Sequence, residues 1–547
     1  MPPNEEDSQK LNARLEYSVS KKFPYYTLVS KDTNCCLTQT KRGSNSNSKN
    51  SESIREPLKD LTESKNYCLP WYLPFCGYIS CIFLFIVSWI REFIYGIGPL
   101  TGINKTRYKE NNRDGYTTLF DHFEGFYIRN MYRRQRNVFE NTIGSVPGAT
   151  VTYIEKVSDD ANWTFKLDEN NRKECVNLAS YNYLGFAEKD GLCTELSVTA
   201  CNDEGISCCS PAHEFGARKI HYELEKTVSE FLGVEDAIAV GMGFATNSLN
   251  LPCLISKGCL VISDQCNHAS AILGIRLSGA TVNVFKHNDP EDLERILRQA
   301  IIKGNQGEKW NKILIIIEGI YSMEGTICKL PEIVRIKKKY GAYLYLDEAH
   351  SVGAMGSNGR GVVDYFGINP NDVDVLMGTF TKSFGGAGGY IAGSKKLIDY
   401  LRTSSHAKCY AGNISPPVAR QVISSMRCIM DQKKDGMKRI HQLALNTKYF
   451  RSRLKEMGFI VCGDDDSPVI PIMLFMQGKV MPFVLKCREK GVVSVGVGFP
   501  GTKLNEERMR FCVSAGHTKE MLESALKVIS DVGDYTNCKY GLYYRNK

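Results

Sequence analysis

From about Val176 onward, the sequence alternates short apolar runs with longer amphipathic stretches, and this alternation constrains the fold more than any other feature. Short apolar runs predict strands that are buried on both faces. The stretches between them, such as "DPEDLERILRQAII" and "PEIVRIKKKYG", predict helices. We therefore expect an α/β fold with a mainly parallel sheet covered by helices. The predicted strands are "AIAV" (237–240), "CLVIS" (259–263), "TVNVF" (281–285), "ILIII" (313–317), "AYLYL" (342–346) and "VDVLM" (373–377).

The composition of the chain argues against several classes of function. The chain has 547 residues and 43% hydrophobic content, which allows a large core and more than one domain. Its net charge of +9 comes from 69 basic against 60 acidic residues, without a dominating basic block, so nucleic acid is not an expected partner. The 20 cysteines show no Cys-x-x-Cys spacing and no secretion signal precedes them, so we expect reduced thiols and no metal site.

The N-terminal part differs from the rest. Residues 1–67 are polar and of low complexity, which predicts a disordered tail. The uncharged run from Cys68 to Ile90 predicts a membrane helix over 68–95 that spans the bilayer or lies in its interface, with a buried core helix as the alternative. Basic residues after this run favour a cytosolic position for everything that follows. The predicted order continues with a linking segment (110–175), a large domain (176–430) and a small C-terminal domain (431–547).

Polar side chains follow several of the predicted strands. Ligands of parallel sheets bind at the carboxyl ends of strands, where these side chains should meet. After "AIAV" comes "GMGFATNSLN", a glycine-rich turn before a helix that is a candidate phosphate site. The other strand ends bring His268, Ser322, Asp347 with His350, and Lys382.

Asp347 and Lys382 suggest a specific chemistry. A buried aspartate needs a cationic partner, and a protonated pyridine nitrogen would serve. A lysine that faces the same crevice has its pKa lowered by desolvation and can form a Schiff base. Together with a glycine-rich anion loop and a histidine that faces the ring, these residues indicate pyridoxal 5'-phosphate chemistry.

The motifs "GTFTKSFGG", "DEAHSVGAMGSNGRGV", "EGIYSMEG", "GMGFATNSLN", "ISDQCNHAS" and "RMRFCVSAGHTKEML" resemble those of the α-oxoamine synthases among the fold-type I pyridoxal phosphate enzymes. The resemblance covers roughly Tyr116 to Tyr540 and is closest to the long-chain-base subunit 2 branch of the serine palmitoyltransferase family. It implies a PLP-dependent transferase fold of type I, with a large domain and a smaller α+β C-terminal domain.

The same resemblance implies residue roles. Lys382 would hold the cofactor covalently and later act as the base, and Asp347 would pair with the pyridinium nitrogen. His350 and Ser322 would contact the ring oxygen region, and His268 would stack on the ring. The remaining roles are Thr379, Gly243 and Phe244 at the phosphate, Asn182 near the substrate, and Arg510 at the substrate carboxylate with Arg508 as the fallback.

The implied reaction is a decarboxylative condensation of L-serine with palmitoyl-CoA that gives 3-ketosphinganine, CO2 and CoA, the first step of sphingolipid biosynthesis. The implied partners are serine palmitoyltransferase subunit 1 in a heterodimer, small activating subunits and Orm-type regulators, at the endoplasmic reticulum membrane with the catalytic domain in the cytosol. Alternatives are an acyltransferase acting on glycine or alanine, a non-catalytic scaffold subunit, which Lys382 disfavours, and a membrane-tethered phosphate-binding module.

The chain departs from the family pattern in three places. "CCSPAHEFGARKIHYELE" keeps Gly216 and His221 but has Ala212 where the family usually has arginine. "AGNISPP" has Gly412 and Asn413 where the family has small polar residues, and "FPGTK" (499–503) replaces a Pro-Ala-Thr-Pro loop. By the resemblance, the first departure affects packing, the subunit contact or acyl entry. The second affects polar contacts that reach the cofactor phosphate across the subunit boundary, and the third affects loop closure over serine.

Overall fold

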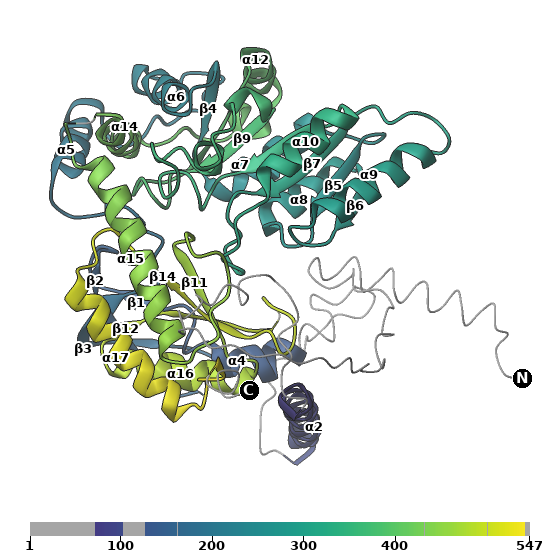
Figure 1. Ribbon diagram of the computed structural model, residues 1–547. Coiled ribbons are helices and arrows are strands. Elements are labelled where there is room, and N and C mark those ends of the chain that lie inside the picture. The colour runs from purple at the N-terminus through teal and green to yellow at the C-terminus, as the bar shows by residue number, and fades with distance from the viewer. Residues whose placement is uncertain (1–71, 102–125, 161, 432, 500, 542–547) are drawn as a thin grey trace, which may run out of the picture. The chain divides into compact units, whose positions relative to one another are not determined.

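The computed structural model describes residues 72–101, 126–160, 162–431, 433–499 and 501–541, with side chains through Ile94 in the first of these ranges (Figure 1). All of them belong to one compact unit, Asn66–Lys547. The predicted disordered tail, 1–67, lies outside the described residues.

The central sheet has the strand order β4-β10-β9-β8-β7-β5-β6. Apart from β10, which is antiparallel to β4 and β9, the paired strands are parallel. Each apolar run predicted as a strand forms one, so the mainly parallel sheet is confirmed. The strands are β4 (Asp236–Val240), β5 (Leu260–Asp264), β6 (Thr281–Phe285), β7 (Ile313–Glu318), β8 (Tyr343–Asp347), β9 (Val375–Thr379) and β10 (Gly389–Gly393).

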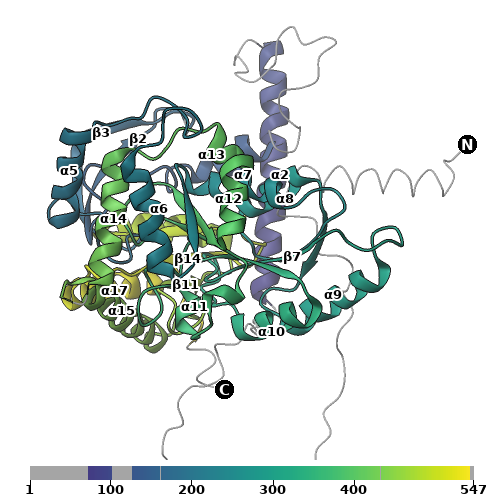
Figure 2. The same ribbon diagram turned by 90° about the horizontal axis from the view of Figure 1, so that it is seen from above.

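Alternate residues of these strands enter two separate apolar clusters, one on each face of the sheet. The cluster with Ile262 and Ile317 packs against α6 (Lys219–Leu232), α9 (Pro290–Lys303), α10 (Leu330–Tyr340) and α14 (Pro416–Met430). The cluster with Val261 and Ile316 packs against α7 (Gly243–Leu254), α8 (Ala269–Ser278) and α12 (Lys395–Ser404). Figures 1 and 2 show the helices on both sides of the sheet.

Burial on both faces is wrong for β6, whose residues Thr281 and Val282 are exposed. β6 is the edge strand of the sheet and therefore has a neighbouring strand on one side only. The shorter elements of this region are α5 (Leu192–Glu204), α11 (Val362–Tyr365), the 3-10 helix η2 (Pro370–Asp372) and α13 (His406–Cys409).

Two smaller sheets form a second core. One has the order β1-β2-β3-β12 and the other β11-β14-β13. Val138, Leu178 and apolar residues from 450 to 540 share one cluster, so the chain before the large sheet packs with the C-terminal part. The domain boundaries named above stay a prediction. The elements are β1 (Thr142–Ile143), β2 (Thr150–Val157), β3 (Lys166–Asn177), α15 (Gly436–Glu456), β11 (Val469–Met473), α16 (Gln477–Glu489), β12 (Val492–Val493), β13 (Val495–Val497), β14 (Arg508–Cys512) and α17 (Lys519–Tyr535).

The predicted membrane segment forms α2 (Tyr72–Thr101), the long purple helix in Figure 2. Its stretch Tyr72–Ile94 is long and apolar enough to cross a membrane. Of the apolar 18-residue part of this stretch, 17% is buried inside the protein. That low burial contradicts the alternative of a core helix. Glu92 accepts hydrogen bonds from Arg129 at 2.7 Å and Asn130 at 2.8 Å, which join α2 to the π-helix η1 (Ile128–Tyr132) and the following α4 (Arg133–Gln135).

Candidate active site

The candidate site lies at the carboxyl edge of the central sheet. Glu318, Asp347 and Thr379 are the last residues of β7, β8 and β9, three neighbouring parallel strands. Lys382 follows three residues after the end of β9. The strand ends predicted from the sequence therefore meet at one edge.

Asp347 is buried and its carboxylate is held in place. Oδ2 accepts a hydrogen bond from Asn247 Nδ2 at 2.7 Å, and Oδ1 accepts one from the backbone N–H of Ala349 at 2.9 Å. Asn247 is itself fixed, because its Oδ1 accepts from the Tyr345 hydroxyl and its Nδ2 also donates to Ser270 Oγ. The orientation of the carboxylate is thus set before any ligand binds.

Lys382 is partly buried, and its Nζ lies 5.5 Å from the centroid of the Tyr181 ring. Desolvation lowers the pKa of Lys382 to about 8, although Asp347 and Glu318 act in the opposite direction, and Arg510 lowers the pKa further. An amine in this range is partly neutral near physiological pH, as a nucleophilic lysine requires.

Glu318 and Ser270 hold His268 in place through hydrogen bonds. The His268 backbone N–H donates to Glu318 Oε1 at 2.5 Å, and the His268 Nδ1 shares a hydrogen bond of 2.7 Å with Ser270 Oγ. The ring meets that of Phe244 edge-on at 6.0 Å. Burial lowers the pKa of His268 and raises the pKa of Glu318 well above its ordinary value, so burial favours the neutral form of both groups.

His350 is buried beside two tyrosines. Its Nδ1 shares a hydrogen bond of 2.9 Å with the Tyr183 hydroxyl, and its ring lies edge-on to Tyr181 at 5.1 Å. Burial, with Lys382 and Arg510 contributing, lowers the pKa of His350 well below its ordinary value. Ser322 lies partly exposed in the turn after β7 and makes no hydrogen bond to the part of the chain that the structure describes.

The predicted phosphate site is the N-terminus of α7. The backbone N–H of Thr246 donates to Met242 O and makes the first hydrogen bond of the helix. The N–H groups of Gly243 and Phe244, which precede it, therefore make no hydrogen bond within the helix. A Cβ on Gly243 would lie 2.9 Å from Thr379 Oγ1, so only glycine brings this backbone so close to the threonine hydroxyl. That hydroxyl bonds the Gly388 carbonyl at 2.9 Å.

Two arginines reach the site from β14. The Arg510 guanidinium carbon lies 4.8 Å from the Tyr181 ring centroid, and Nη1 lies 3.8 Å from Met323 Sδ. Arg508 is held more fully, since it donates to Glu506 O and Met323 O and pairs with Glu324 at 3.6 Å. Arg510 thus makes fewer polar contacts than Arg508, and the role of either residue at a substrate carboxylate stays a prediction.

The side chain of Asn182 is engaged elsewhere. Its Nδ2 donates to Pro147 O at 3.1 Å and its Oδ1 accepts from the Ala187 N–H at 3.2 Å. The preceding residue, Tyr181, contacts both Lys382 and Arg510 instead. A substrate role for Asn182 stays a prediction.

Two of the three departures from the family pattern, those near Ala212 and near Gly412, lie together in space. Pro211 and Gly412 form an isolated antiparallel bridge, and Asn413 Nδ2 donates to Gly216 O at 2.9 Å. His221 Nε2 shares a hydrogen bond of 2.8 Å with Ile414 O. The segments that carry the departures are thus bonded to one another within this chain.

This chain is similar to known proteins over most of its length. A family model for aminotransferase class I and II matches residues 173–529. Serine palmitoyltransferase 2 of Caenorhabditis elegans is 51% identical over 468 residues, which cover 85% of this chain and 83% of that protein. Serine palmitoyltransferase 3 of Homo sapiens is 48% identical, covering 84% of each chain. The chain belongs to the serine palmitoyltransferase family.

Solved structures agree with this placement in the serine palmitoyltransferase family. A structure described as SPT with PLP internal aldimine is 25% identical and superposes with a TM-score of 0.68, covering 77% of this chain and 100% of that one. The type I fold expected from the motifs is therefore confirmed.

Sequence reasoning missed several residues that lie at this candidate site. Glu318 follows "ILIII" directly and has the same strand-end signal as Asp347, so the pattern that indicates Asp347 indicates Glu318 as well. Tyr181 and Asn247 gave no local signal, because their contacts to Lys382 and Asp347 bridge segments far apart in the sequence.

Proposed function

We propose that the chain is the catalytic subunit of serine palmitoyltransferase, an acyltransferase that condenses L-serine with palmitoyl-CoA to 3-ketosphinganine, CO2 and CoA in the first step of sphingolipid biosynthesis. Membership of the family supports the activity. The observation that carries it is the meeting of Lys382 and Asp347, with their opposite charges, at one sheet edge.

The residues present fit pyridoxal 5'-phosphate. A buried fixed carboxylate, a lysine with lowered pKa and free N–H groups beside Gly243 and Thr379 match a pyridine nitrogen, an aldehyde and a phosphate respectively. Asp347, His350, Ser322, His268, Thr379, Gly243 and Phe244 would hold the cofactor, as predicted. Bound, it supplies an electron sink for charge that develops at the α-carbon of an amino acid.

The side chains of the protein have separate tasks. Lys382 Nζ takes the α-proton of serine, because with a pKa of about 8 roughly a tenth of such amines is neutral at pH 7. Asp347 keeps a negative charge where a protonated ring nitrogen needs one. Arg510 receives the serine carboxylate through its planar donors, with Arg508 as the fallback.

The apolar helix α2 supports membrane anchoring. We propose a location at the endoplasmic reticulum membrane with the catalytic part in the cytosol, and a heterodimer with serine palmitoyltransferase subunit 1, joined by small activating subunits and Orm-type regulators. An apolar product suits release beside a membrane.

The test is an assay of the full chain co-purified with its partners and loaded with pyridoxal 5'-phosphate. L-Serine, glycine and L-alanine are each offered with a series of acyl-CoAs, and CoA release and the ketone product are measured. We expect serine with palmitoyl-CoA to react fastest. A preference for glycine or alanine would instead identify a related acyltransferase, and no reaction with any pair would contradict a catalytic role.

A further inference from the structure

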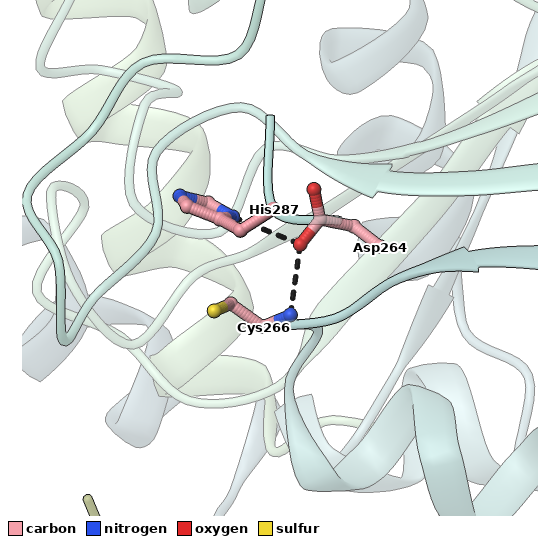
Figure 3. Close-up of side chains that lie close together, drawn as sticks. All are labelled: Asp264, Cys266 and His287. Carbon is pink, nitrogen blue, oxygen red and sulfur yellow. Dashed lines mark hydrogen bonds and ion pairs between the residues drawn. The ribbon is translucent and has the colours of Figure 1, made fainter. Parts of the chain in front are cut away.

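Asp264, Cys266 and His287 form a cluster at the end of β5, outside the residues assigned above (Figure 3). Their ligand atoms lie within 4.8 Å of one another, a spacing that suits a metal ion. The carboxylate is already occupied, however. Oδ1 accepts from His287 Nδ1 at 2.9 Å and from the Cys266 N–H at 2.8 Å, and Oδ2 accepts from the Asn288 N–H at 2.8 Å.

The other two donors are equally unsuited to a metal. His287 Nε2 shares a hydrogen bond of 2.8 Å with Thr326 Oγ1, so both ring nitrogens are used. Burial raises the pKa of the Cys266 thiol, whereas a metal needs the thiolate. The cluster is a hydrogen-bonded link from Asp264 through His287 to Thr326.

Thr326 belongs to the turn between Ile320 and Ile327, which carries Ser322 and Met323. The turn closes on itself through the Tyr321 N–H to Thr326 O at 3.0 Å and the Gly325 N–H to Tyr321 O at 2.8 Å. The His287 ring also packs edge-on against Tyr321 at 4.4 Å. His287 therefore holds the turn at both of its sides.

At its tip the turn meets the two arginines of β14. Met323 O accepts from Arg508 Nη1 at 3.0 Å, and Met323 Sδ lies 3.8 Å from Arg510 Nη1. Glu324 adds an ion pair with Arg508 at 3.6 Å. The position of the turn thus sets the position of the guanidinium groups.

We propose that His287 is a positioning residue that, clamped between Asp264 and Thr326, fixes the 320–327 turn and thereby aims Arg510 at the carboxylate of the amino-acid substrate. This inference rests on the proposed function, because it takes Arg510 as the carboxylate receptor. His287, in the loop between β6 and α9, would then be one of the residues that determine which amino acid binds.

The local charges favour a doubly protonated His287. The Asp264 carboxylate, 1% exposed, raises the pKa of His287 against the effect of burial, and Glu324 and Asp464 act in the same direction. An imidazolium donates from both nitrogens, to Asp264 on one side and to the Thr326 hydroxyl on the other. Hydrogen bonds from a charged donor are the stronger kind.

Thr326 allows a matched test, because Thr326→Val removes the acceptor at nearly constant volume and Thr326→Ser keeps it. Binding of L-serine to the full chain loaded with pyridoxal 5'-phosphate is measured by calorimetry without acyl-CoA, and amide hydrogen exchange of residues 320–327 is followed in parallel. We expect T326V to raise the Kd for serine about fivefold, which is less than the full effect of one lost hydrogen bond to a charged group because His287 acts on serine only through the turn. Exchange in the turn should speed up as well, while T326S matches the wild type in both measurements.

A purely structural defect would weaken the use of serine and of the thioester alike. The positioning role instead predicts that the KM for palmitoyl-CoA stays within about twofold of wild type in T326V. Equal serine affinity in T326V and wild type, or equal losses in T326V and T326S, overturns the inference. If the wild-type chain released no CoA, the proposed activity would be refuted, but the ratio of serine affinity between T326V and T326S, with the exchange rates, would still decide the role of this link.

Discussion

The two halves of the site are held in different ways. On the side of the central sheet, each carboxylate oxygen of Asp347 accepts a hydrogen bond, and the backbone of His268 is bonded to Glu318. On the side of β14, Arg510 is held by a ring and a sulfur, and its buried Nε has no hydrogen-bond partner within the described residues. An unsatisfied buried donor is costly, and a ligand can satisfy it.

Under the proposed function, the half that would hold the cofactor is complete in advance, whereas the half that would hold the substrate is completed by its ligand. Changes to the first half should therefore reduce turnover, and changes to the second should mainly reduce affinity for the amino acid.

Lys382→Ala should lower turnover by roughly a thousandfold or more, because no other amine replaces a residue that is both covalent anchor and base. Borohydride reduction of wild-type protein should attach the cofactor to the Lys382 peptide, detected by mass spectrometry, and the variant should show no such adduct. The thermal unfolding midpoint should change little. The exposed lysine of α12 gives the control, since Lys395→Ala should keep full activity. Undiminished serine-dependent CoA release by K382A would remove Lys382 from the reaction.

Asp347→Asn should lower kcat by about a hundredfold, because a neutral side chain no longer favours a protonated ring nitrogen. Steady-state kinetics with serine and palmitoyl-CoA measure this effect. The control lies at the other end of the same sheet, where Asp374 pairs with Lys337 at 2.8 Å. Asp374→Asn should leave kcat within about twofold of wild type, since its charge is remote from the chemistry. A wild-type rate in D347N would refute the electrostatic role.

The sheet-side half of the site was largely predictable from the sequence. Local apolar runs gave the strands, and parallel strands place their carboxyl ends together, so Asp347 and Lys382 were expected to meet. β10 was missed because "GYIAG" begins and ends with glycine and resembles a loop. Its glycines are required by packing, since a Cβ on Gly389 would lie 2.6 Å from Gly378 O.

The β14 side was not predictable from local patterns. Arg510 was named through the resemblance of "RMRF" to the family motif, but its contacts with Tyr181 and Met323 join parts of the chain 329 and 187 residues apart (510 − 181 and 510 − 323). The sequence also offered no reason to connect His287 with this turn. Such contacts depend on tertiary packing, which cannot be inferred from the propensity or the periodicity of a local sequence.

Arg510→Lys should raise the KM for serine by about thirtyfold with a smaller change in kcat, because an ammonium cannot make the paired contacts of a guanidinium with a carboxylate. Arg508→Lys should raise it only about threefold, since Arg508 already bonds Glu506, Met323 and Glu324. Serine titrations at saturating palmitoyl-CoA provide the measurement. If R508K were the more damaging variant, the carboxylate role would pass to Arg508.

Glu318→Gln should have the smallest effect, with kcat within about twofold of wild type, because a neutral amide oxygen can accept from the His268 N–H as the neutral acid does. Glu318→Ala, which removes the acceptor, should lose about tenfold. If ionised Glu318 served the chemistry, Gln and Ala would instead be equally harmful.

The stability of E318Q and of the wild-type protein should also depend differently on pH. Burial raises the pKa of Glu318 in the folded state, so its contribution to the free energy of unfolding is complete below the ordinary carboxyl pKa of about 4.3 and is lost as the pH rises towards the folded-state pKa. Gln has no proton to lose, so E318Q should gain stability relative to wild type as the pH rises above about 5. Denaturant unfolding across that range measures the difference, and parallel curves for the two proteins would mean that Glu318 is ionised in the native site.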